Sequence, residues 1–170
     1  SDRRHDPRAS TAARDTRQLE LDRGLLAKVP SLFRDQFGAR PAALIADQNT
    51  FAAAGRSIQT AFERAKHPTV TPFVFNDPNL YAEYTFFEKL DSWLAGQDAI
   101  PIAVGSGTIN DLTKLAAFRN RRQYLAVATA ASMDGYTAFG SSITYQGSKQ
   151  TFDCPAPQVV VADLDVIAAA

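Results

Sequence analysis

The residues with the clearest chemical potential are 104–111, which read Val-Gly-Ser-Gly-Thr-Ile-Asn-Asp. Glycine lets the backbone turn sharply and approach a ligand without a Cβ in the way. An apolar run over 99–104 precedes this turn and a helical pattern follows it, so the turn leads into a helix N-terminus. Helix N-termini present backbone N–H groups and a positive dipole end to phosphate. By itself the stretch fits a phosphate site and a tight turn whose glycines only satisfy geometry equally well.

Two further polar segments follow predicted strands. Asp47 ends the apolar run 42–46, and a loop of small residues, 129–136, follows the run 124–128. In a parallel sheet these segments and the glycine turn all lie at the carboxyl ends of strands, where such sheets bind ligands. Their convergence predicts a nucleotide site. Thr108 and Asp111 also resemble a capping box at the start of the helix.

The elements that must position these residues alternate between strand and helix. Strands are expected at 18–21 (an edge), 42–46, 70–75 (near an edge, because of Pro72), 99–104, 124–128 and 159–162. Helices are expected at 25–37 (kinked or divided at Pro30), from 51 to about 66 (capped by Asn49 or Thr50), 80–94, after the glycine turn to about 118, and from about 166 (capped by Asp163 or Asp165). This order predicts an α/β fold: a Rossmann-like, mainly parallel sheet with helices on both faces. A β-hairpin is expected over 143–145 and 150–152.

Length and composition suit one domain. Of the 170 residues, 1–17 read as a flexible leader and 18–170 as one folded domain that carries the predicted nucleotide site. The formal net charge is +0, which argues against nucleic-acid and anionic-membrane partners. Three arginines near a helix end, Arg119, Arg121 and Arg122, are expected to complement the helix dipole.

Cysteine and histidine usage bounds the environment and the metal chemistry. A single cysteine, Cys154, the lack of a signal-peptide pattern and the lack of a long apolar run predict a cytoplasmic protein. The two histidines, His5 and His67, make a histidine-based metal site within these residues unexpected. The aromatic stripe of 80–94, including Trp93, has the spacing of core packing.

Three motifs resemble one family. The segments GSGTINDLTK, TAASMDGY and VVADLDV, in that order, resemble the glycerol-1-phosphate dehydrogenase family, within the wider group of iron-containing alcohol dehydrogenases, glycerol dehydrogenase and 3-dehydroquinate synthase. The resemblance runs from about residue 18 to the end, and it implies that 18–170 form a dinucleotide-binding domain. It implies an oxidoreductase that transfers hydride between NAD(P)H and a small ketone or polyol phosphate, such as dihydroxyacetone phosphate and glycerol 1-phosphate. It also implies a C-terminal helical domain that holds a divalent metal, usually zinc.

The resemblance assigns roles to individual residues. The cofactor-binding residues would be Asp47, Gly105, Ser106, Gly107, Thr108, Ile109, Asn110, Asp111, Thr129, Ala130, Ala131 and Ser132. Asp47 would accept hydrogen bonds from the adenosine ribose and repel a 2′-phosphate, favouring NAD over NADP; otherwise it is an ordinary strand-end turn residue. Asp134 would orient a polyol hydroxyl of the substrate; otherwise it belongs to an Asp-Gly turn. Lys149 is a weaker candidate for a substrate or cofactor phosphate, with a solvated surface lysine as its alternative.

Two departures from the family pattern matter. Ala138 stands where the family places a serine that touches the cofactor, with Thr137 beside it. The family's metal ligands lie beyond the VVADLDV motif, so residues 1–170 are expected to bind the cofactor without catalysing the reaction. The alternatives are a stand-alone nucleotide-binding module and a 3-dehydroquinate synthase-like lyase. Homo-oligomerisation stays open.

Overall fold

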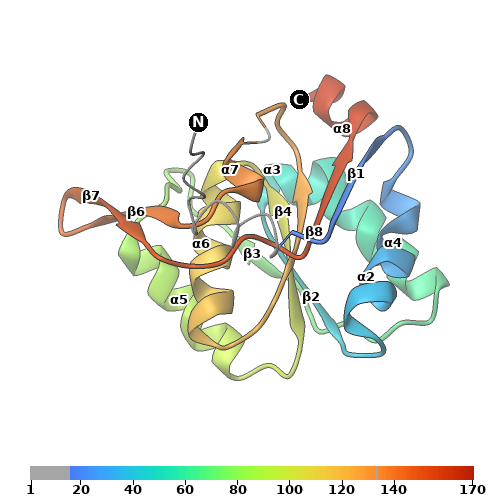
Figure 1. The fold of residues 1–170 in the computed structure, drawn as a ribbon, viewed down its shortest axis with the longest axis horizontal. Helices are drawn as coiled ribbons and strands as arrows, with labels where there is room; N and C mark the ends of the chain where they lie inside the picture. The colour runs from blue at the N-terminus through green and yellow to red at the C-terminus, as the bar shows by residue number, and fades with distance from the viewer. Residues whose placement is uncertain (1–15, 133) are drawn as a thin grey trace, which may run out of the picture.

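The computed structural model describes residues 16–132 and 134–170, and for Asp134 it describes the backbone alone. Six parallel strands form one sheet in the order β1-β8-β5-β4-β2-β3 (Figure 1). Their bounds are Gln18–Asp22, Val159–Asp163, Leu125–Ala128, Ile100–Gly105, Ala42–Asp47 and Phe73–Phe75 in that spatial order. The α/β prediction and the parallel sheet are confirmed.

The burial of the strands follows their apolar content. β4, β5 and β8 are buried at every position, and β2 at every position but Asp47, because helices cover both faces of the sheet. β1 and β3 are the edges, as expected. β3 is shorter than the predicted 70–75 and begins after Pro72, which has no backbone N–H to donate to a ladder.

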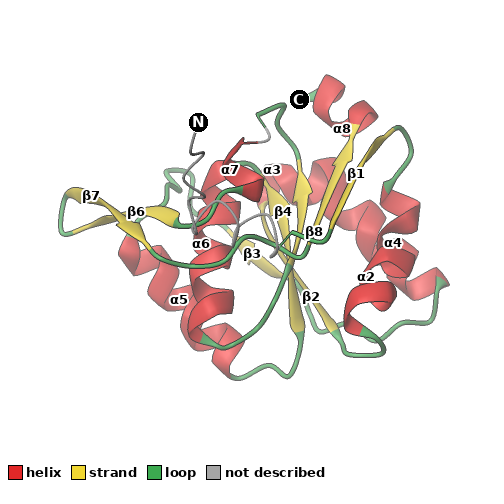
Figure 2. Cartoon of the chain, viewed as in Figure 1, coloured by secondary structure: helices red, strands yellow, loops and turns green. Residues whose placement is uncertain are grey.

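Two helical layers enclose the sheet. α2 (Val29–Phe37) and α4 (Arg56–Arg64) pack on one face through Phe33, Ile58 and Phe62. On the other face lie α5 (Tyr84–Ala95) and α6 (Gly107–Arg119), as Figure 2 shows. The aromatic stripe is confirmed as core packing, since Phe87 is buried and Trp93 packs against the same cluster.

The connections create a reversal of strand order in the middle of the sheet. After β2 the chain crosses by α4 to β3, and after β4 it crosses by α6 to β5 in the opposite direction. β2 and β4 are neighbours, with Ile45 opposite Ala103. The loops that leave these two strands therefore diverge to opposite faces. Such a switch point is where open α/β sheets bind ligands.

Several predicted boundaries on the N-terminal side are wrong. The helix expected from residue 80 begins at Tyr84, because the Glu83 carboxylate caps it by accepting from Thr85 N. The helix expected from 51 begins with α3 (Gln48–Thr50) and a π-helical turn, η2 (Phe51–Gly55), before α4. Its cap is Asp47, not Asn49 or Thr50. At Pro30 the predicted division holds: a 3₁₀ turn, η1 (Leu26–Lys28), precedes α2.

The C-terminal third adds a hairpin and two short helices. The predicted hairpin is confirmed as β6 (Ser141–Tyr145) and β7 (Ser148–Phe152). The expected loop 129–136 contains the start of a short helix, α7 (Asp134–Thr137). The last helix, α8 (Leu164–Ala169), begins two residues before the predicted 166, with Asp163 as its cap.

The predicted leader, 1–17, lies outside the described residues up to residue 15. From Thr16 the chain already belongs to the fold, since Thr16 Oγ1 donates to Pro157 O at 2.8 Å and Arg17 N to Gln158 O at 2.8 Å. Within the described part of the chain, no helix combines the length and apolar character needed to cross a membrane.

Candidate functional site

The glycine turn lies at the carboxyl end of β4 and opens α6. Ser106 is the N-cap in an extended conformation and makes no side-chain capping hydrogen bond. The predicted capping box of Thr108 and Asp111 is therefore wrong, because α6 already includes Thr108 in its first turn. The first N–H groups of a helix have no intrahelical acceptor, so those of Gly107, Thr108 and Ile109 are available to a ligand at this end.

The two glycines of the turn have different surroundings. A Cβ on Gly105 would lie 2.6 Å from Ile109 Cβ, so glycine is needed there for the strand to pack closely against the helix. A Cβ on Gly107 would meet no protein atom within 4 Å. Open space therefore lies in front of the helix N-terminus at Gly107, where a phosphate group could approach the backbone.

Asp47 lies at the carboxyl end of the neighbouring strand. Its Oδ1 accepts from Thr50 N at 2.8 Å, and Thr50 Oγ1 accepts from Asp47 N at 3.1 Å, which makes a reciprocal capping box. The side chain is half-buried, and this cap uses one carboxylate oxygen. The other oxygen leaves acceptor capacity for a further donor such as a hydroxyl.

The loop after β5 joins the glycine turn through Gly105. Thr129 N donates to Gly105 O at 3.3 Å, and the buried Tyr136 hydroxyl donates to the same carbonyl at 2.8 Å. Burial raises the pKa of Tyr136, while hydrogen bonds with the backbone of Ala130 and Thr129 oppose that shift. Ala130 is half-buried, and Ala131 and Ser132 are exposed. The two predicted cofactor segments are therefore adjacent.

The side chains of Asn110 and Asp111 are engaged inside the protein. Asn110 Oδ1 accepts from the Tyr124 hydroxyl at 2.7 Å, and its Nδ2 donates to Gly135 O at 3.0 Å. Ser141 Oγ donates to the backbone carbonyl of Asp111 at 2.6 Å and to its carboxylate Oδ1 at 3.3 Å. Burial raises the pKa of Asp111, and the positive charge of Lys114 opposes that shift. These two residues line the turn by position, but their side chains fix α6 to the segment 135–141.

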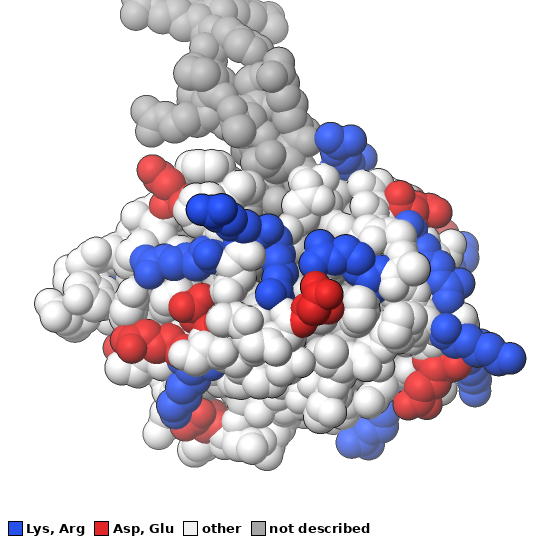
Figure 3. Space-filling model, turned by 90° about the horizontal axis from the view of Figure 1, so that it is seen from below, with Lys and Arg blue, Asp and Glu red and all other residues white. Residues whose placement is uncertain are grey.

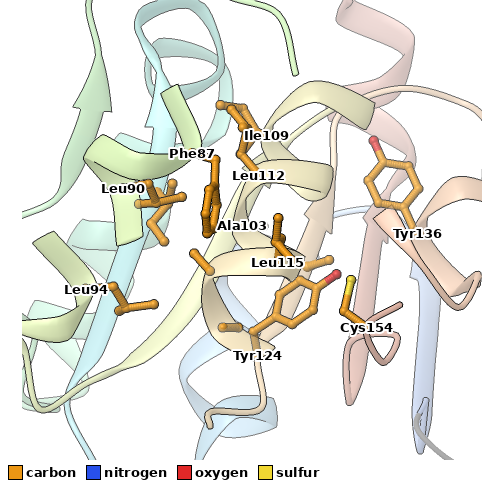
Figure 4. Close-up of a cluster of buried hydrophobic side chains, with 14 of the residues drawn as sticks. Phe87, Leu90, Leu94, Ala103, Ile109, Leu112, Leu115, Tyr124, Tyr136 and Cys154 are labelled. Atoms are coloured by element: carbon orange, nitrogen blue, oxygen red, sulfur yellow. The ribbon is translucent and has the colours of Figure 1, made fainter. Parts of the chain in front are cut away.

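Three polar side chains, those of Tyr124, Cys154 and Lys114, are buried beside the apolar residues of α6. Figure 4 shows Tyr124 beside Cys154, with Tyr136 nearer the carboxyl edge. Burial raises the pKa of Tyr124 well above 10.0 and that of Cys154 to about 12, so both stay protonated at neutral pH. Lys114, from α6, is 1% exposed and donates to backbone carbonyls of the segment 135–140.

The predicted substrate residues lie away from the turn itself or outside what is described. Asp134 is the first residue of α7, and its side chain lies outside the described residues. Lys149 is exposed on β7, and its positive charge is a minor opponent of the rise that burial causes in the pKa of Asp111. Ala138 follows α7, and its carbonyl accepts from Lys114 Nζ at 2.7 Å.

Two hollows lie outside the carboxyl ends of β2, β4 and β5. One, of about 980 Å³, lies between α4 and α8, and a smaller one of about 260 Å³ lies near the amino ends of the strands, beside Arg121 and Arg122. Figure 3 shows that amino-end face, where basic and acidic side chains stand side by side; Arg40 and Asp98 pair at 3.2 Å. Among residues 16–132 and 134–170, no group of three or more histidine, cysteine, aspartate or glutamate side chains is arranged to hold a metal ion.

Sequence reasoning missed two residues of this region. Lys114 reads as one charged residue on a helix, yet it is buried, and its position between Thr113 and Leu115 in a largely apolar stretch was the available signal. Tyr136 carried no signal of its own, because its partner, Gly105, is 31 residues away in sequence.

Comparisons with known proteins agree with this fold. A family model described as iron-containing alcohol dehydrogenase matches residues 20–170. A glycerol-1-phosphate dehydrogenase [NAD(P)+] from Halalkalibacterium halodurans is 30% identical over 153 residues, covering 88% of this chain and 38% of the relative. This chain also matches two relatives of the same name from Geobacillus species, and it covers 31% and 37% of their lengths. The chain therefore spans well under half of these curated relatives.

Solved structures share the fold. Glycerol dehydrogenase from Schizosaccharomyces pombe superposes with a TM-score of 0.75 at 22% identity, covering 91% of this chain and 39% of that one. Sulfoacetaldehyde reductase from Bifidobacterium kashiwanohense, solved in complex with NAD⁺, superposes with a TM-score of 0.72 at 15% identity. It covers 88% of this chain and 45% of that structure. At these identities the likeness concerns the fold alone.

Proposed function

Because the chain belongs to the iron-containing alcohol dehydrogenase family, we propose that it binds NAD(H) or NADP(H) at the carboxyl ends of β2, β4 and β5. The observation that carries the proposal is the open helix N-terminus at Gly107, located at the switch point of the sheet. The names of the relatives, glycerol-1-phosphate dehydrogenase [NAD(P)+], support the cofactor class.

Each segment at the carboxyl ends of β2, β4 and β5 has a proposed part in binding. The backbone N–H groups of 107–109 receive the pyrophosphate, because they are free of intrahelical acceptors and the space at Gly107 is open. Asp47 receives ribose hydroxyls at the adenosine end through the carboxylate oxygen that its cap leaves free. The segment 129–132 borders the cofactor on the β5 side. The bound cofactor supplies the hydride, and the chain supplies position and electrostatics.

The substrate proposal rests on the relatives. We propose a small ketone or polyol phosphate, of the kind that glycerol-1-phosphate dehydrogenases name, with Asp134 and Lys149 as contacts. The described residues do not fit the metal of this family, because they hold no group of three ligands. The proposal therefore gives this chain cofactor binding and leaves the metal ligands to another part of the complete enzyme; residues 1–170 alone are expected to be inactive.

A binding module without chemistry is the second candidate, favoured by that same shortage of metal ligands among the described residues. The two candidates share the cofactor site and differ in activity. Joining the chain to the metal-binding region of a relative separates them: ketone-phosphate reduction by the hybrid supports the dehydrogenase. A hybrid that folds, holds its metal and binds NADH but reduces none of the ketone phosphates supports the binding module.

Calorimetric titration tests the cofactor site itself. The 170-residue chain is expected to bind NADH more tightly than NADPH, because the Asp47 carboxylate repels a 2′-phosphate. Asp47→Asn keeps a good N-cap but removes the charge, and should improve NADPH binding relative to NADH by about tenfold. If neither nucleotide binds the unmodified chain, the proposal is wrong. If Asp47→Asn leaves their ratio unchanged, Asp47 lies outside the site.

A further inference from the structure

Lys114 is a buried lysine with an unusual set of partners. Its Nζ donates to three backbone carbonyls: Ala138 O at 2.7 Å, Gly140 O at 3.1 Å and Gly135 O at 3.3 Å. An ammonium group has three donors, so the three carbonyls match its capacity. In the described part of the chain, Asp111 acts on Lys114 through its charge and not through an ion pair.

Burial of the Lys114 ammonium group has a desolvation cost, which its three carbonyl partners offset. Burial lowers the pKa of Lys114, with the charge of Asp111 opposing the shift, so the charged form is disfavoured in the folded chain. An apolar residue in place of Lys114 would leave three backbone carbonyls without this donor, and a buried acceptor left unpaired is costly. The effect of Lys114 falls on these carbonyls: it fixes the backbone of 135–140 against α6.

The segment that Lys114 holds leads directly to the glycine turn. Tyr136 lies between the carbonyls of Gly135 and Ala138, and its hydroxyl donates to Gly105 O at 2.8 Å. Asn110 adds a second contact from α6, through Nδ2 to Gly135 O at 3.0 Å. The backbone position of 135–140 therefore determines where the Tyr136 hydroxyl lies relative to the end of β4.

We propose that Lys114 is a positioning residue for the cofactor site, acting through the carbonyls of 135–140 and the Tyr136 hydroxyl to hold the Gly105 end of the phosphate turn. This inference rests on the proposed cofactor function. Lys114 does not touch the cofactor. Lys114 is buried in α6. It sets the geometry of the groups at the carboxyl end of β4.

The test compares Lys114→Met, which keeps the length of the side chain but donates no hydrogen bond, with a control variant. Ile58→Val is the control. Ile58 is fully buried on the opposite face of the sheet, so its substitution lowers the stability of the fold without changing a contact of 135–140. Amide hydrogen exchange of each chain is measured by mass spectrometry, and the NADH dissociation constant by titration. Lys114→Met should speed amide exchange within 135–141 by about tenfold or more, because at least one charge-assisted hydrogen bond is lost. It should also weaken NADH binding.

The outcomes separate this inference from the proposed function. A wild-type chain that does not bind NADH refutes the proposed function. A wild-type chain that binds NADH, beside a Lys114→Met chain that binds it equally well or exchanges uniformly like Ile58→Val, overturns the role of Lys114. Should Lys114→Met not fold, Tyr136→Phe decides, because it removes the bond to Gly105 and keeps Lys114 in place. An unchanged NADH dissociation constant in Tyr136→Phe then overturns the inference.

Discussion

Gly107→Val should abolish NADH binding while leaving the fold intact. A side chain at Gly107 meets no protein atom within 4 Å, so the new valine fits the folded chain. Valine in place of glycine at a helical position changes stability by about 0.5 kcal/mol or less, in the favourable direction. The valine side chain instead fills the space through which a pyrophosphate reaches the helix N-terminus. Losing two charge-assisted hydrogen bonds there costs about 3 kcal/mol or more, which weakens binding more than ~100-fold.

Gly105→Ala, two residues earlier, should have the opposite profile. Its Cβ would lie 2.6 Å from Ile109 Cβ, an atom fixed to the helix backbone, so helix and strand must shift apart. Overpacking of this kind costs roughly 1–3 kcal/mol. For a chain of this size that corresponds to a fall in the melting temperature of about 2–12 °C. The backbone N–H groups of 107–109 still face open space at Gly107, so NADH should still stabilise this variant. The stabilisation should be smaller than in the wild type, because the shift moves the Gly105 end of the turn.

Thermal unfolding followed by circular dichroism, with and without NADH, checks both variants. At a concentration of 100 times the dissociation constant, NADH stabilises the wild-type chain by about 2.7 kcal/mol, or roughly 5–11 °C. Gly107→Val should melt within about 2 °C of the wild type and show no NADH shift. A full NADH shift in Gly107→Val would refute the assignment of the turn, and a collapsed fold would refute the claim of open space.

Three further outcomes follow from buried groups. Thr113→Val should raise the free energy of unfolding by about 1 kcal/mol in urea titrations, because Thr113 Oγ1 is buried without a hydrogen-bond partner among the described residues; a loss of stability contradicts this. Cys154 should react with a disulfide reagent at pH 9 only through unfolding, since a pKa of about 12 leaves a thiolate fraction of roughly 0.001; rapid labelling of folded protein contradicts it. Burial raises the pKa of Asp111 above 3.8, so the folded chain keeps a proton that the unfolded chain loses. The free energy of unfolding should therefore fall as the pH rises from 3.8 to the raised pKa of Asp111 in the folded chain. Asp111→Asn should remove this part of the pH dependence; an equal pH dependence in both chains contradicts the prediction.

The parallel sheet and its helices could be predicted from the sequence because their signals are local. Apolar runs such as 99–104 identify buried strands, and the helical spacing of Ile109, Leu112 and Leu115 identifies α6. Helix starts were less predictable, because a cap depends on backbone angles that side-chain type only biases. Ser106 is extended and begins α6, although Thr108 and Asp111 have the residue types of a capping box.

The interior of the site could not be predicted for a different physical reason. Lys114 and Tyr136 act on backbone atoms that are 21 to 31 residues away in sequence, and a carbonyl is the same group in every residue. No residue type therefore marks these contacts. Asp47 shows the converse case: its type and place predict a ligand contact, and the structure adds a structural role as the cap of α3.

Nuclear magnetic resonance of the ¹⁵N-labelled chain, titrated with NADH, tests the central claim most directly, because it locates the bound nucleotide residue by residue. The account predicts the largest amide shift changes at 105–109, together with changes at 47–50 and 129–132. Shift changes confined to the hollow between α4 and α8, or to the arginines at the amino ends of the strands, would contradict it. So would a spectrum that NADH leaves unchanged.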